Sequence, residues 1–557
     1  MEKFLKATIQ DVCRLCESGF YDFIIVGTGM GGGVLAQSLL ENGSSARVLL
    51  IERGGLLFST HCLNTSRPHW SHNIPAGPSQ DNDIVYQSLK EPVNTVTQGS
   101  YPYVGGEIYC LGGRGNVWGL YTPKVHPDDL ESYFPESVCS YLEKGGYERA
   151  YQFLSNDPEA SLEKAYPSNG AASTQTVDKV SAVIDDLNRD TKELGCSFTS
   201  CPLAAEFVPR RPERAIYQFP MGAFSPVSWI LDRVYNRDER LTVLANTRVV
   251  AVNRKSDDQP AVVSLVAIDS SGEERNIPVG NATVILSAGT LGTASIALRS
   301  GLGEGRRNDP GKPTNLVGRG LMDHDIWGTR FEVLQSPNLA VLNKQPLKLN
   351  SWVKFADEPV LVNVAVNADT FLGRTQVVKM PTVYLDQSLD EVPEAKFNEA
   401  LEQESTSKSV VQVAFCLTAP LDNRNRVLNR PEPTTTIKIE HIKDNSCHIP
   451  TMQRIAQAIG ASLGRKVAGT GTDQLPPLPK LGKTGFGMVA HEVGTMRMGE
   501  KEGEGVVDEN LKMTGLSNLY VCDLSVLPVS PAANPSLTLV ALAQRLADHL
   551  LKVGRHS

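Results

Sequence analysis

The segment Tyr21–Gly55, YDFIIVGTGMGGGVLAQSLLENGSSARVLLIERGG, decides how this chain begins to fold. It opens with the apolar run Phe23–Val26 and closes with a second run, Val48–Ile51. Such runs predict strands that are buried on both faces of a parallel sheet, and the helical pattern between them completes a β-α-β unit. Three glycines follow the first run in G-x-G-x-x-G spacing: Gly27, Gly29 and Gly32.

This spacing predicts a dinucleotide-binding site. Gly27 permits the tight turn, Gly29 lets a pyrophosphate approach the backbone, and Gly32 lets the helix pack closely on the strand. The amino-terminal end of the helix carries a partial positive charge that favours phosphates. Glu52, at the end of the second strand, can accept hydrogen bonds from ribose hydroxyls. The alternative is a glycine-rich turn in another kind of α/β domain, and the framing apolar runs argue against it.

Length and charge narrow the class of protein. The chain has 557 residues, enough for at least two domain-sized units. Its net charge of −8 argues against a nucleic-acid partner and against an anionic membrane surface. The charged amino-terminal segment resembles no secretory signal, and no apolar stretch is long enough to span a bilayer. We therefore expect an intracellular, cytoplasmic protein without a membrane partner.

Two further glycine-rich stretches point to the same cleft. Gly105–Lys124, GGEIYCLGGRGNVWGLYTPK, describes backbone that passes very close to something flat or charged, although a turn between strands is the structural alternative. Ala282–Leu302 reads as strand, glycine turn and helix. Between these stretches and the first lie His61, His69 and His72, whose spacing fits no familiar ligand set. We expect a long loop over a cofactor there, and no metal site.

The middle of the chain changes character. Residues 350–445 hold separate β-rich runs joined by polar turns, which predict an antiparallel sheet of its own. The predicted fold class is α/β (α+β overall), with a Rossmann-like nucleotide-binding domain and a second, substrate-binding domain built on that sheet. We expect the first domain to be discontinuous, formed by residues 1–125, 240–330 and 485–557. Residues 126–239 and 331–484 would form the second.

Two residues of the carboxy-terminal part stand out. His491 lies in HEVGTMRMG, and Asn534 lies in AANPSLTLVALAQRLADHLLK, where it suits the N-cap of a helix with Pro535 at its first position. Taken alone, a histidine is more often structural and an N-cap asparagine is usually only a cap.

Here the sequence resembles a known family. The IERGG unit, AGTLGTASIALRSGL, VGRGLMDHD (Val317–Asp325) and GLSNLYVCDLSVLPVSPAANPSLTLVALAQRLADHLL are similar, in this order, to the glucose–methanol–choline (GMC) oxidoreductase superfamily. Within it, the pattern is closest to that of the pyranose 2-oxidases. The segment LGGRGNVWGLYTP of this chain resembles their flavin loop. In that group a histidine before the tryptophan bonds covalently to the flavin, whereas this chain has Val117 before Trp118.

The resemblance implies an FAD-dependent oxidase or dehydrogenase that acts on the CH–OH group of a small organic substrate, with FAD bound non-covalently. His491 would take the hydroxyl proton as general base while hydride passes to flavin N5, and Asn534 would position the substrate oxygen. Asn116 and Trp118 would lie near the isoalloxazine ring, and Asp523 near the ribityl chain. The implied cofactor-binding residues are Gly27, Gly29, Met30, Gly32, Glu52, Arg53, Gly112, Gly113, Gly115, Asn116, Val117, Trp118, Val249, Ala288, Gly289, Asp523, Asn534, Pro535 and Ser536.

Other functions stay open at this point. The same fold could dehydrogenate a C–C or C–N bond or catalyse a redox-neutral lyase reaction, for example on a specialised metabolite. FAD could also have a purely structural role. The sequence holds no second G-x-G-x-x-G, so we expect electrons to come from an organic substrate and to leave to O2 or another acceptor. Substrate identity and self-association into a homo-oligomer are left open.

Overall fold

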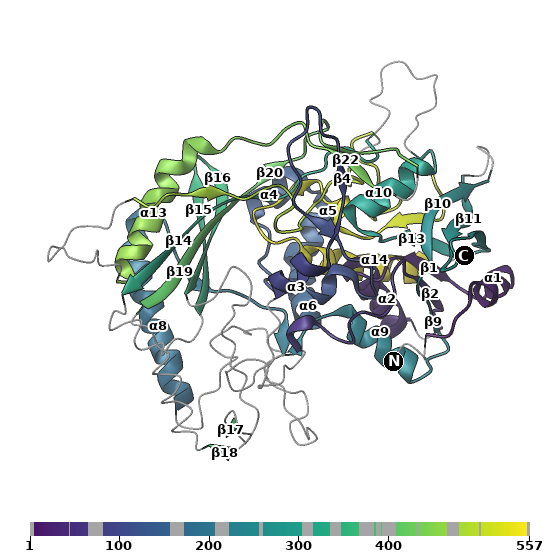
Figure 1. The fold of residues 1–557 in the computed structure, drawn as a ribbon, viewed down its shortest axis with the longest axis horizontal. Coiled ribbons are helices and arrows are strands. Elements are labelled where there is room, and N and C mark those ends of the chain that lie inside the picture. The colour runs from purple at the N-terminus through teal and green to yellow at the C-terminus, as the bar shows by residue number, and fades with distance from the viewer. Residues whose placement is uncertain are drawn as a thin grey trace.

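The computed structural model describes most of the chain as two sheets with their covering helices (Figure 1). The described residues are 5–43, 45–64, 82–155, 172–206, 222–255, 260–302, 316–334, 347–366, 384–385, 391–392, 408–431, 434–464, 478–500 and 503–553. His69 and His72 lie outside them.

The first sheet is parallel and five-stranded, in the order β24-β13-β1-β2-β9. Its strands are β1 (Phe23–Val26), β2 (Val48–Ile51), β9 (Leu241–Leu244), β13 (Thr283–Leu286) and β24 (Leu519–Val521). All residues of β1 and β2 are buried, and Phe23 pairs with Val48, so the two apolar runs form adjacent strands as predicted. The carboxyl ends of the strands therefore lie along one edge of the sheet. Four turns that contain glycine or an acidic residue meet at this edge.

Helices pack on the parallel sheet and complete the nucleotide-binding fold. After β1 comes α2 (Met30–Asn42), and after β13 comes α10 (Gly289–Arg299). The carboxy-terminal helix α14 (Ser536–Val553) packs along α2 and is apolar over most of its length. The chain starts with α1 (Ile9–Glu17), a short amphipathic helix that contacts β12.

A small antiparallel sheet extends the first layer. It consists of β10 (Arg248–Arg254), β11 (Val262–Ile268) and β12 (Glu274–Pro278). β9 and β10 follow each other directly in the sequence, but they belong to different sheets. The chain turns between them at Asn246, which has a φ of +54° and donates its N–H to the carbonyl of Gly54.

The second large sheet is the predicted antiparallel one. Its order is β23-β14-β19-β16-β15-β6. Its strands are β6 (Thr199–Ser200), β14 (Asp325–Leu334), β15 (Leu347–Phe355), β16 (Glu358–Val366), β19 (Lys408–Leu417) and β23 (Gly482–Lys483). The helices α8 (Ala172–Thr191) and α13 (Ile449–Ser462) lie beside it at the outer end of the molecule (Figure 1). The fold class expected from the sequence is thus confirmed.

The remaining elements are short and connect these layers. They are α3 (Asn82–Leu89), α4 (Pro127–Tyr133), α5 (Glu136–Tyr141), α6 (Tyr147–Leu154), α9 (Pro226–Tyr235), β3 (Glu91–Pro92), β4 (Asn94–Thr95), β5 (Gly106–Glu107), β7 (Ala205–Glu206), β8 (Gly222–Ala223), β17 (Tyr384–Leu385), β18 (Glu391–Val392), β20 (Ala419–Pro420), β21 (Arg426–Leu428), β22 (Thr436–Lys438) and β25 (Val529–Ser530).

The buried side chains form two cores. One core joins the parallel sheet, α2 and α14, and it also includes α4, α5, α6 and α9 from within residues 126–239. Tyr147 of α6, for example, hydrogen-bonds Thr538 of α14 at 3.1 Å. The other core lies between the antiparallel sheet and α8 and α13. The cores therefore divide residues 126–239 between them, and the domain boundaries given above stay a prediction.

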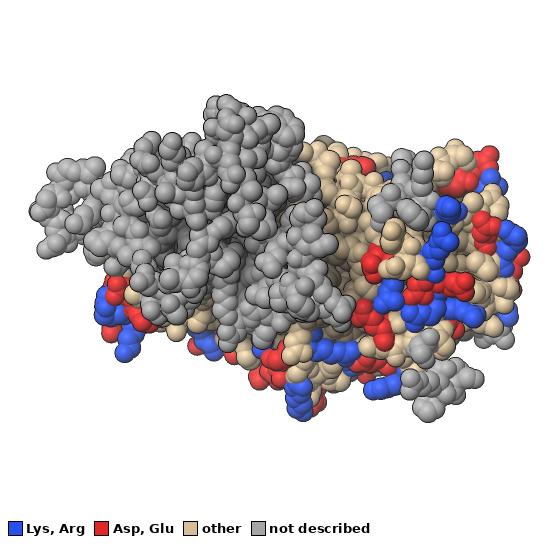
Figure 2. All heavy atoms as spheres, turned by 90° about the horizontal axis from the view of Figure 1, so that it is seen from below, with Lys and Arg blue, Asp and Glu red and all other residues tan. Residues whose placement is uncertain are grey.

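The outer surface of the nucleotide-binding part carries both signs of charge. On the face seen in Figure 2, basic and acidic side chains are interspersed at the end of the molecule that holds α1 and β10–β12 in Figure 1. No helix in the described part of the chain is both long enough and apolar enough to cross a membrane.

Candidate functional site

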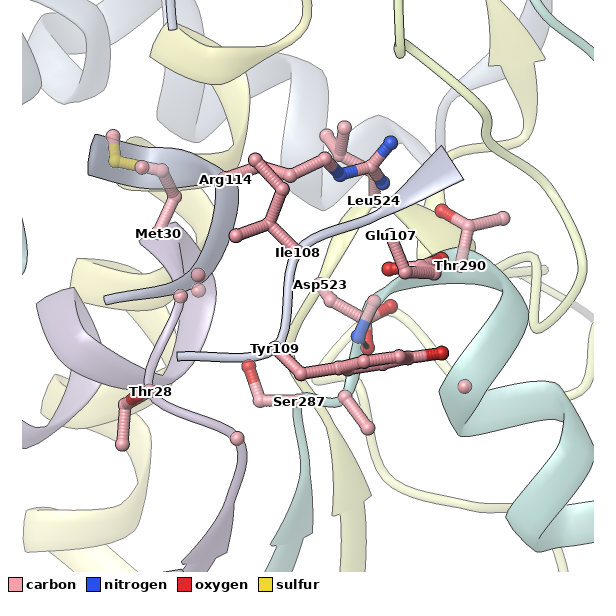
Figure 3. A pocket seen from close by; sticks show the side chains of 18 of the residues that line it. Thr28, Met30, Glu107, Ile108, Tyr109, Arg114, Ser287, Thr290, Asp523 and Leu524 are labelled. Atoms are coloured by element: carbon pink, nitrogen blue, oxygen red, sulfur yellow. Dashed lines mark hydrogen bonds between the residues drawn. The ribbon is translucent and has the colours of Figure 1, made fainter. Parts of the chain in front are cut away.

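One cavity runs along the carboxyl edge of the parallel sheet and brings together segments that are far apart in the sequence. Figure 3 shows Thr28 and Met30 on one side of it and Thr290 on the other, with Ser287 and Asp523 in between. Of the residues expected from the sequence, fifteen line this cavity: Gly27, Gly29, Met30, Glu52, Arg53, Gly113, Gly115, Val117, Trp118, Val249, Ala288, Gly289, His491, Asp523 and Ser536. Gly32, Gly112, Asn116, Asn534 and Pro535 lie next to the lining but not in it.

The glycine turn after β1 has the shape that a pyrophosphate requires. Gly27 has a φ of +101°, and a Cβ there would meet the carbonyl oxygen of Ser287 at 2.2 Å. A Cβ on Gly29 would meet nothing in the protein closer than the carbonyl of Gly112 at 4.0 Å, so the space in front of Gly29 is open to the cavity. The α2 helix begins at the next residue, with its free N–H groups at this end. The turn therefore fits a bound diphosphate.

The Glu52 side chain fixes the same turn through hydrogen bonds. Its Oε2 accepts from the backbone N–H of Thr28 at 3.1 Å and from the Thr28 hydroxyl at 2.6 Å, and its Oε1 accepts from Gly54 N–H at 3.0 Å. Burial raises the pKa of Glu52, and these hydrogen bonds oppose the rise. Oε2 thus accepts two of these hydrogen bonds and Oε1 only one, so Glu52 can still accept from a ribose hydroxyl through Oε1.

The loop Gly112–Trp118 crosses over the turn. Gly112 donates its N–H to the Thr28 hydroxyl at 2.9 Å, which ties the two glycine stretches together. Asn116, expected beside the flavin ring, is fully buried outside the lining. Its amide donates to Leu111 O at 2.8 Å and accepts from the Ser225 hydroxyl at 2.6 Å. Asn116 thus shapes the loop, while Val117 and Trp118 face the cavity.

His61 supports this loop from behind. It is fully buried, its Nε2 lies 3.0 Å from the carbonyl oxygen of Trp118, and its Nδ1 accepts from the N–H of Leu63 at 3.1 Å. Burial lowers the pKa of His61 to about 3. The described histidine of the group at 61–72 is therefore a neutral structural residue.

Asp523 ties the middle of the cavity together. Its Oδ2 accepts from Gly289 N–H at 3.0 Å and from the Thr293 hydroxyl, and its Oδ1 accepts from Ser525 N–H at 2.9 Å. Burial raises the pKa of this carboxyl, and the hydrogen bonds from Ser525 and Thr293 oppose the rise. Asp523 thus holds the amino-terminal end of α10 beside the turn after β24, where both line the cavity.

His491 lies at the far end of the cavity from Glu52. It follows Ala490, a residue with a φ of +56°, in a turn that is fixed where Gly487 donates its N–H to Asp323 Oδ2 at 2.7 Å. The ring lines the cavity, and its Nδ1 is buried without a partner in the described part of the chain. Burial, followed by the charge of Arg114, lowers the pKa of His491 to about 3. The imidazole is therefore neutral and able to accept a proton.

Asn534 lies in the loop that leads into α14. The helix starts at Ser536, one residue later than the start at Pro535 that an N-cap at Asn534 would give, and the carbonyl of Pro535 accepts from Leu539 N–H at 3.0 Å. Pro535 thus takes the capping position, and the predicted N-cap at Asn534 is wrong by one residue. The loop is held where Ala532 donates its N–H to the Thr418 hydroxyl at 3.1 Å.

A buried charged group surrounds His491, and sequence reasoning missed it. Arg114 and Glu492 form an ion pair with 2.7 Å between Nη1 and Oε2, and the Tyr103 hydroxyl donates to the other oxygen of Glu492. Glu107 faces the same space, and its Oε1 has no partner among the described residues (Figure 3). Burial raises the pKa of Glu107, and Arg114 opposes the rise. The only signal in the sequence was an arginine inside one glycine loop and an acid directly after His491.

Together, the fold and this cavity define a dinucleotide-binding protein with an imidazole at the far end of the cofactor channel. Comparison with known proteins shows a resemblance to one family. A family model described as "GMC oxidoreductase" matches residues 450–543. This chain therefore resembles the GMC oxidoreductases, whose oxidases and dehydrogenases are FAD-dependent flavoproteins.

Full-length relatives and solved structures agree with this. The chain is 22% identical to dehydrogenase pkfF of Emericella nidulans, over 96% of this chain and 93% of that one. It is 22% identical to the large subunit of fructose dehydrogenase of Gluconobacter japonicus, over 95% and 97%. Pyridoxine 4-oxidase of Mesorbium loti has the same fold, with a TM-score of 0.57, 16% identity and coverage of 95% and 99%. The GMC resemblance seen in the sequence is therefore confirmed, and the closer likeness to pyranose 2-oxidases stays a resemblance.

Proposed function

We propose that this protein oxidises the CH–OH group of a small organic molecule with non-covalently bound FAD, and that His491 is the general base. The observation that carries the proposal is the continuity of the cavity. One channel joins the Gly29 turn, which fits a diphosphate, to the neutral ring of His491 and the start of α14 at Ser536.

The residues along the channel fit FAD in order. The Gly29 turn and the α2 end would hold the pyrophosphate, Glu52 the adenosine ribose, Val249 the adenine side, and Asp523 the ribityl region. Bound FAD would supply the acceptor for the hydride that leaves the substrate carbon. Val117, at the position of the flavin-linking histidine of the pyranose 2-oxidases, has no group that could form such a bond. Free α14 N–H groups would favour negative charge beside Ser536.

His491 and Asn534 have different roles at the substrate oxygen. The neutral imidazole accepts the hydroxyl proton, because burial and then the charge of Arg114 lower the pKa of His491 and leave one ring nitrogen with a free lone pair before substrate arrives. The side-chain amide of Asn534 has no hydrogen bond to another described residue, which leaves it able to bind the same oxygen and to orient the C–H bond. O2 or another acceptor would then take up the electrons, since the sequence holds no second dinucleotide motif.

Two measurements test this function. The purified holoprotein is mixed anaerobically with a panel of primary and secondary alcohols and aldoses while the flavin absorbance is followed, and the carbonyl product is quantified. At least one substrate should bleach the flavin with one carbonyl formed per FAD, and bleaching without a carbonyl product would contradict CH–OH oxidation. Denaturation should release yellow flavin into the supernatant, whereas flavin that precipitates with the protein would contradict non-covalent binding.

A further inference from the structure

His324 places a second imidazole directly behind His491. It precedes β14, its side chain is 6% exposed, and its ring centroid lies 4.6 Å from that of His491 with an angle of 58° between the planes. His324 does not line the cavity, whereas His491 does. The two rings are therefore in contact, with His491 between His324 and the cavity.

Three ring nitrogens at this contact need partners. Both nitrogens of His324 and the Nδ1 of His491 are buried, and none of them makes a well-formed hydrogen bond to another described residue. A buried polar atom left without a partner destabilises the fold, so such atoms are almost always paired, often with each other or with one water. Since Nδ1 of His491 is the buried nitrogen, Nε2 is the one available to a substrate in the cavity.

The other side of the His324 ring faces the loop that carries Asn534. Burial and then the His491 ring hold the pKa of His324 well below its usual range, and the backbone of Ala533 opposes this shift. A backbone group that raises the pKa of an imidazole is one that accepts its N–H, namely a carbonyl. The His324 ring therefore lies between His491 and the residue that precedes Asn534.

The backbone fixes this arrangement. Met322 and Val493 exchange hydrogen bonds of 3.2 and 2.9 Å, and Asp323 Oδ2 accepts the N–H of Gly487 at 2.7 Å. The segment that carries His324 thus runs beside the turn that carries His491, with anchors on both sides. The His324 ring has little freedom to move away from its neighbour.

From this geometry we propose that His324 is a positioning residue that sets the tautomer and orientation of His491. One ring nitrogen of His324 accepts the Nδ1–H of His491, directly or through one buried water, and the other donates to the carbonyl of Ala533. This inference rests on the proposed function, because it gives His491 the tautomer that a general base needs: Nδ1 protonated and the Nε2 lone pair facing the substrate. It also links the His491 turn to the Asn534 loop.

Two charged groups near the pair, Arg114 and Glu492, do not offer this contact. Arg114 is a cation that lacks a lone pair, and Glu492 is already bonded to Arg114 and Tyr103. Asp323 uses Oδ2 for Gly487, and its pKa is raised to about 7 by burial and by Glu492, while its Oδ1 is buried without a partner among the described residues. His324 is the neighbour whose ring touches the ring of His491.

The test compares two straight side chains at position 324. His324→Gln keeps an acceptor and a donor, whereas His324→Met has similar length and neither strong group. His324→Phe replaces His324→Met if that variant does not fold with FAD, because the ring keeps the packing. The control is His448→Phe, at a histidine whose ring packs on Phe355 with centroids 5.4 Å apart in the second core region.

Two readouts are measured on the holoenzymes, with FAD content and melting temperature as controls. The first needs no substrate: the rate at which diethyl pyrocarbonate modifies His491 at pH 7, read by peptide mass spectrometry. The second is the anaerobic rate of flavin reduction, against pH, by the alcohol that reacts fastest in the panel. We expect His324→Met to slow modification of His491 and to lower the reduction rate about 10- to 100-fold, the effect of misorienting a reacting group. His324→Gln should restore much of the modification rate and of the reduction rate, and His448→Phe should change neither rate.

The outcomes separate this inference from the proposed function. If His324→Met leaves both rates and the pH profile unchanged while His491→Ala loses reduction, the positioning role is wrong and the function stands. If His491→Ala reduces flavin at the normal rate, the proposed function is wrong, and a changed modification rate in His324→Met would still establish the contact between the two rings. In a His491→Ala background, His324→Gln and His324→Met should be equally slow, since the group that they position is gone.

Discussion

The two ends of the cavity differ in what forms their surface, which is backbone at one end and side chains at the other. At the Gly29 end the binding surface is mainly backbone, from the turn after β1 and the loop that crosses it, and side chains such as Glu52 fix this backbone through hydrogen bonds to Thr28. At the His491 end, side chains from separate parts of the chain meet, and several are charged and buried, with Arg114 and Glu492 as the ion pair. The difference teaches that cofactor binding and chemistry should respond to different kinds of substitution.

The largest effect is expected at the backbone end. Gly29→Val should fold, because a Cβ at Gly29 meets nothing in the protein closer than 4.0 Å, but the side chain would occupy the place of the pyrophosphate. We expect the purified variant to contain no flavin and to take none up in a fluorescence titration with FAD. The matched control is Gly482→Val, at an open position on β23 without a positive φ, which should retain its flavin. A flavin-replete Gly29→Val would mean that the cofactor lies elsewhere.

The next effect separates chemistry from binding at the other end. His491→Ala should lower the rate of flavin reduction by about two to four orders of magnitude, because it removes the general base. Its FAD content and melting temperature should stay close to those of the parent protein, since no hydrogen bond of this ring holds the described structure together. Stopped-flow reduction under anaerobic conditions measures the rate. His448→Ala is the control, and an unchanged rate in His491→Ala would remove the residue from the mechanism.

Removing one partner of the buried ion pair should reduce stability more than removing both. Glu492 is fully buried and Arg114 is one-fifth exposed, so Glu492→Gln leaves a buried guanidinium without its counter-charge. We expect Glu492→Gln or Arg114→Met alone to lower the free energy of unfolding by about 3–5 kcal/mol. The double variant should recover a large part of this loss.

The ion-pair comparison is read from the shift of the urea midpoint at constant slope. The control is the exposed ion pair of Lys124 and Glu148. Replacing Glu148 by Gln in this pair should change the urea midpoint little. A double variant as unstable as the sum of the two single variants would show that the pair does not act as a unit.

The same contrast explains how far the sequence predicts each end of the cavity. The β-α-β unit, the parallel sheet and the separate antiparallel sheet were predictable, because periodicity and glycine spacing are local features of the chain. The buried partners of His491 were not, because Arg114, Glu492 and His324 meet only after distant segments pack together. Asn116 shows the opposite error: a polar residue in a cofactor loop turned out to hold the loop itself.

The smallest effect concerns pH, and it involves one buried histidine from each end. His61 and His491 have pKa values lowered to about 3, whereas an unfolded histidine titrates near 6.5. The unfolded chain therefore binds more protons between these values, and the folded state loses stability as pH falls below 6.5, by about 2 kcal/mol per histidine at pH 5. His61→Gln, which keeps a donor for Trp118 O and an acceptor for Leu63 N–H, should flatten the fall of the urea midpoint between pH 7.5 and pH 5. His491→Gln should flatten it by a similar amount although it lies at the chemical end, since the cause in both places is burial of a neutral ring. If either variant keeps the full slope of the parent protein, folding does not lower the pKa of that histidine, and for His491 this would contradict the argument that burial keeps the ring neutral.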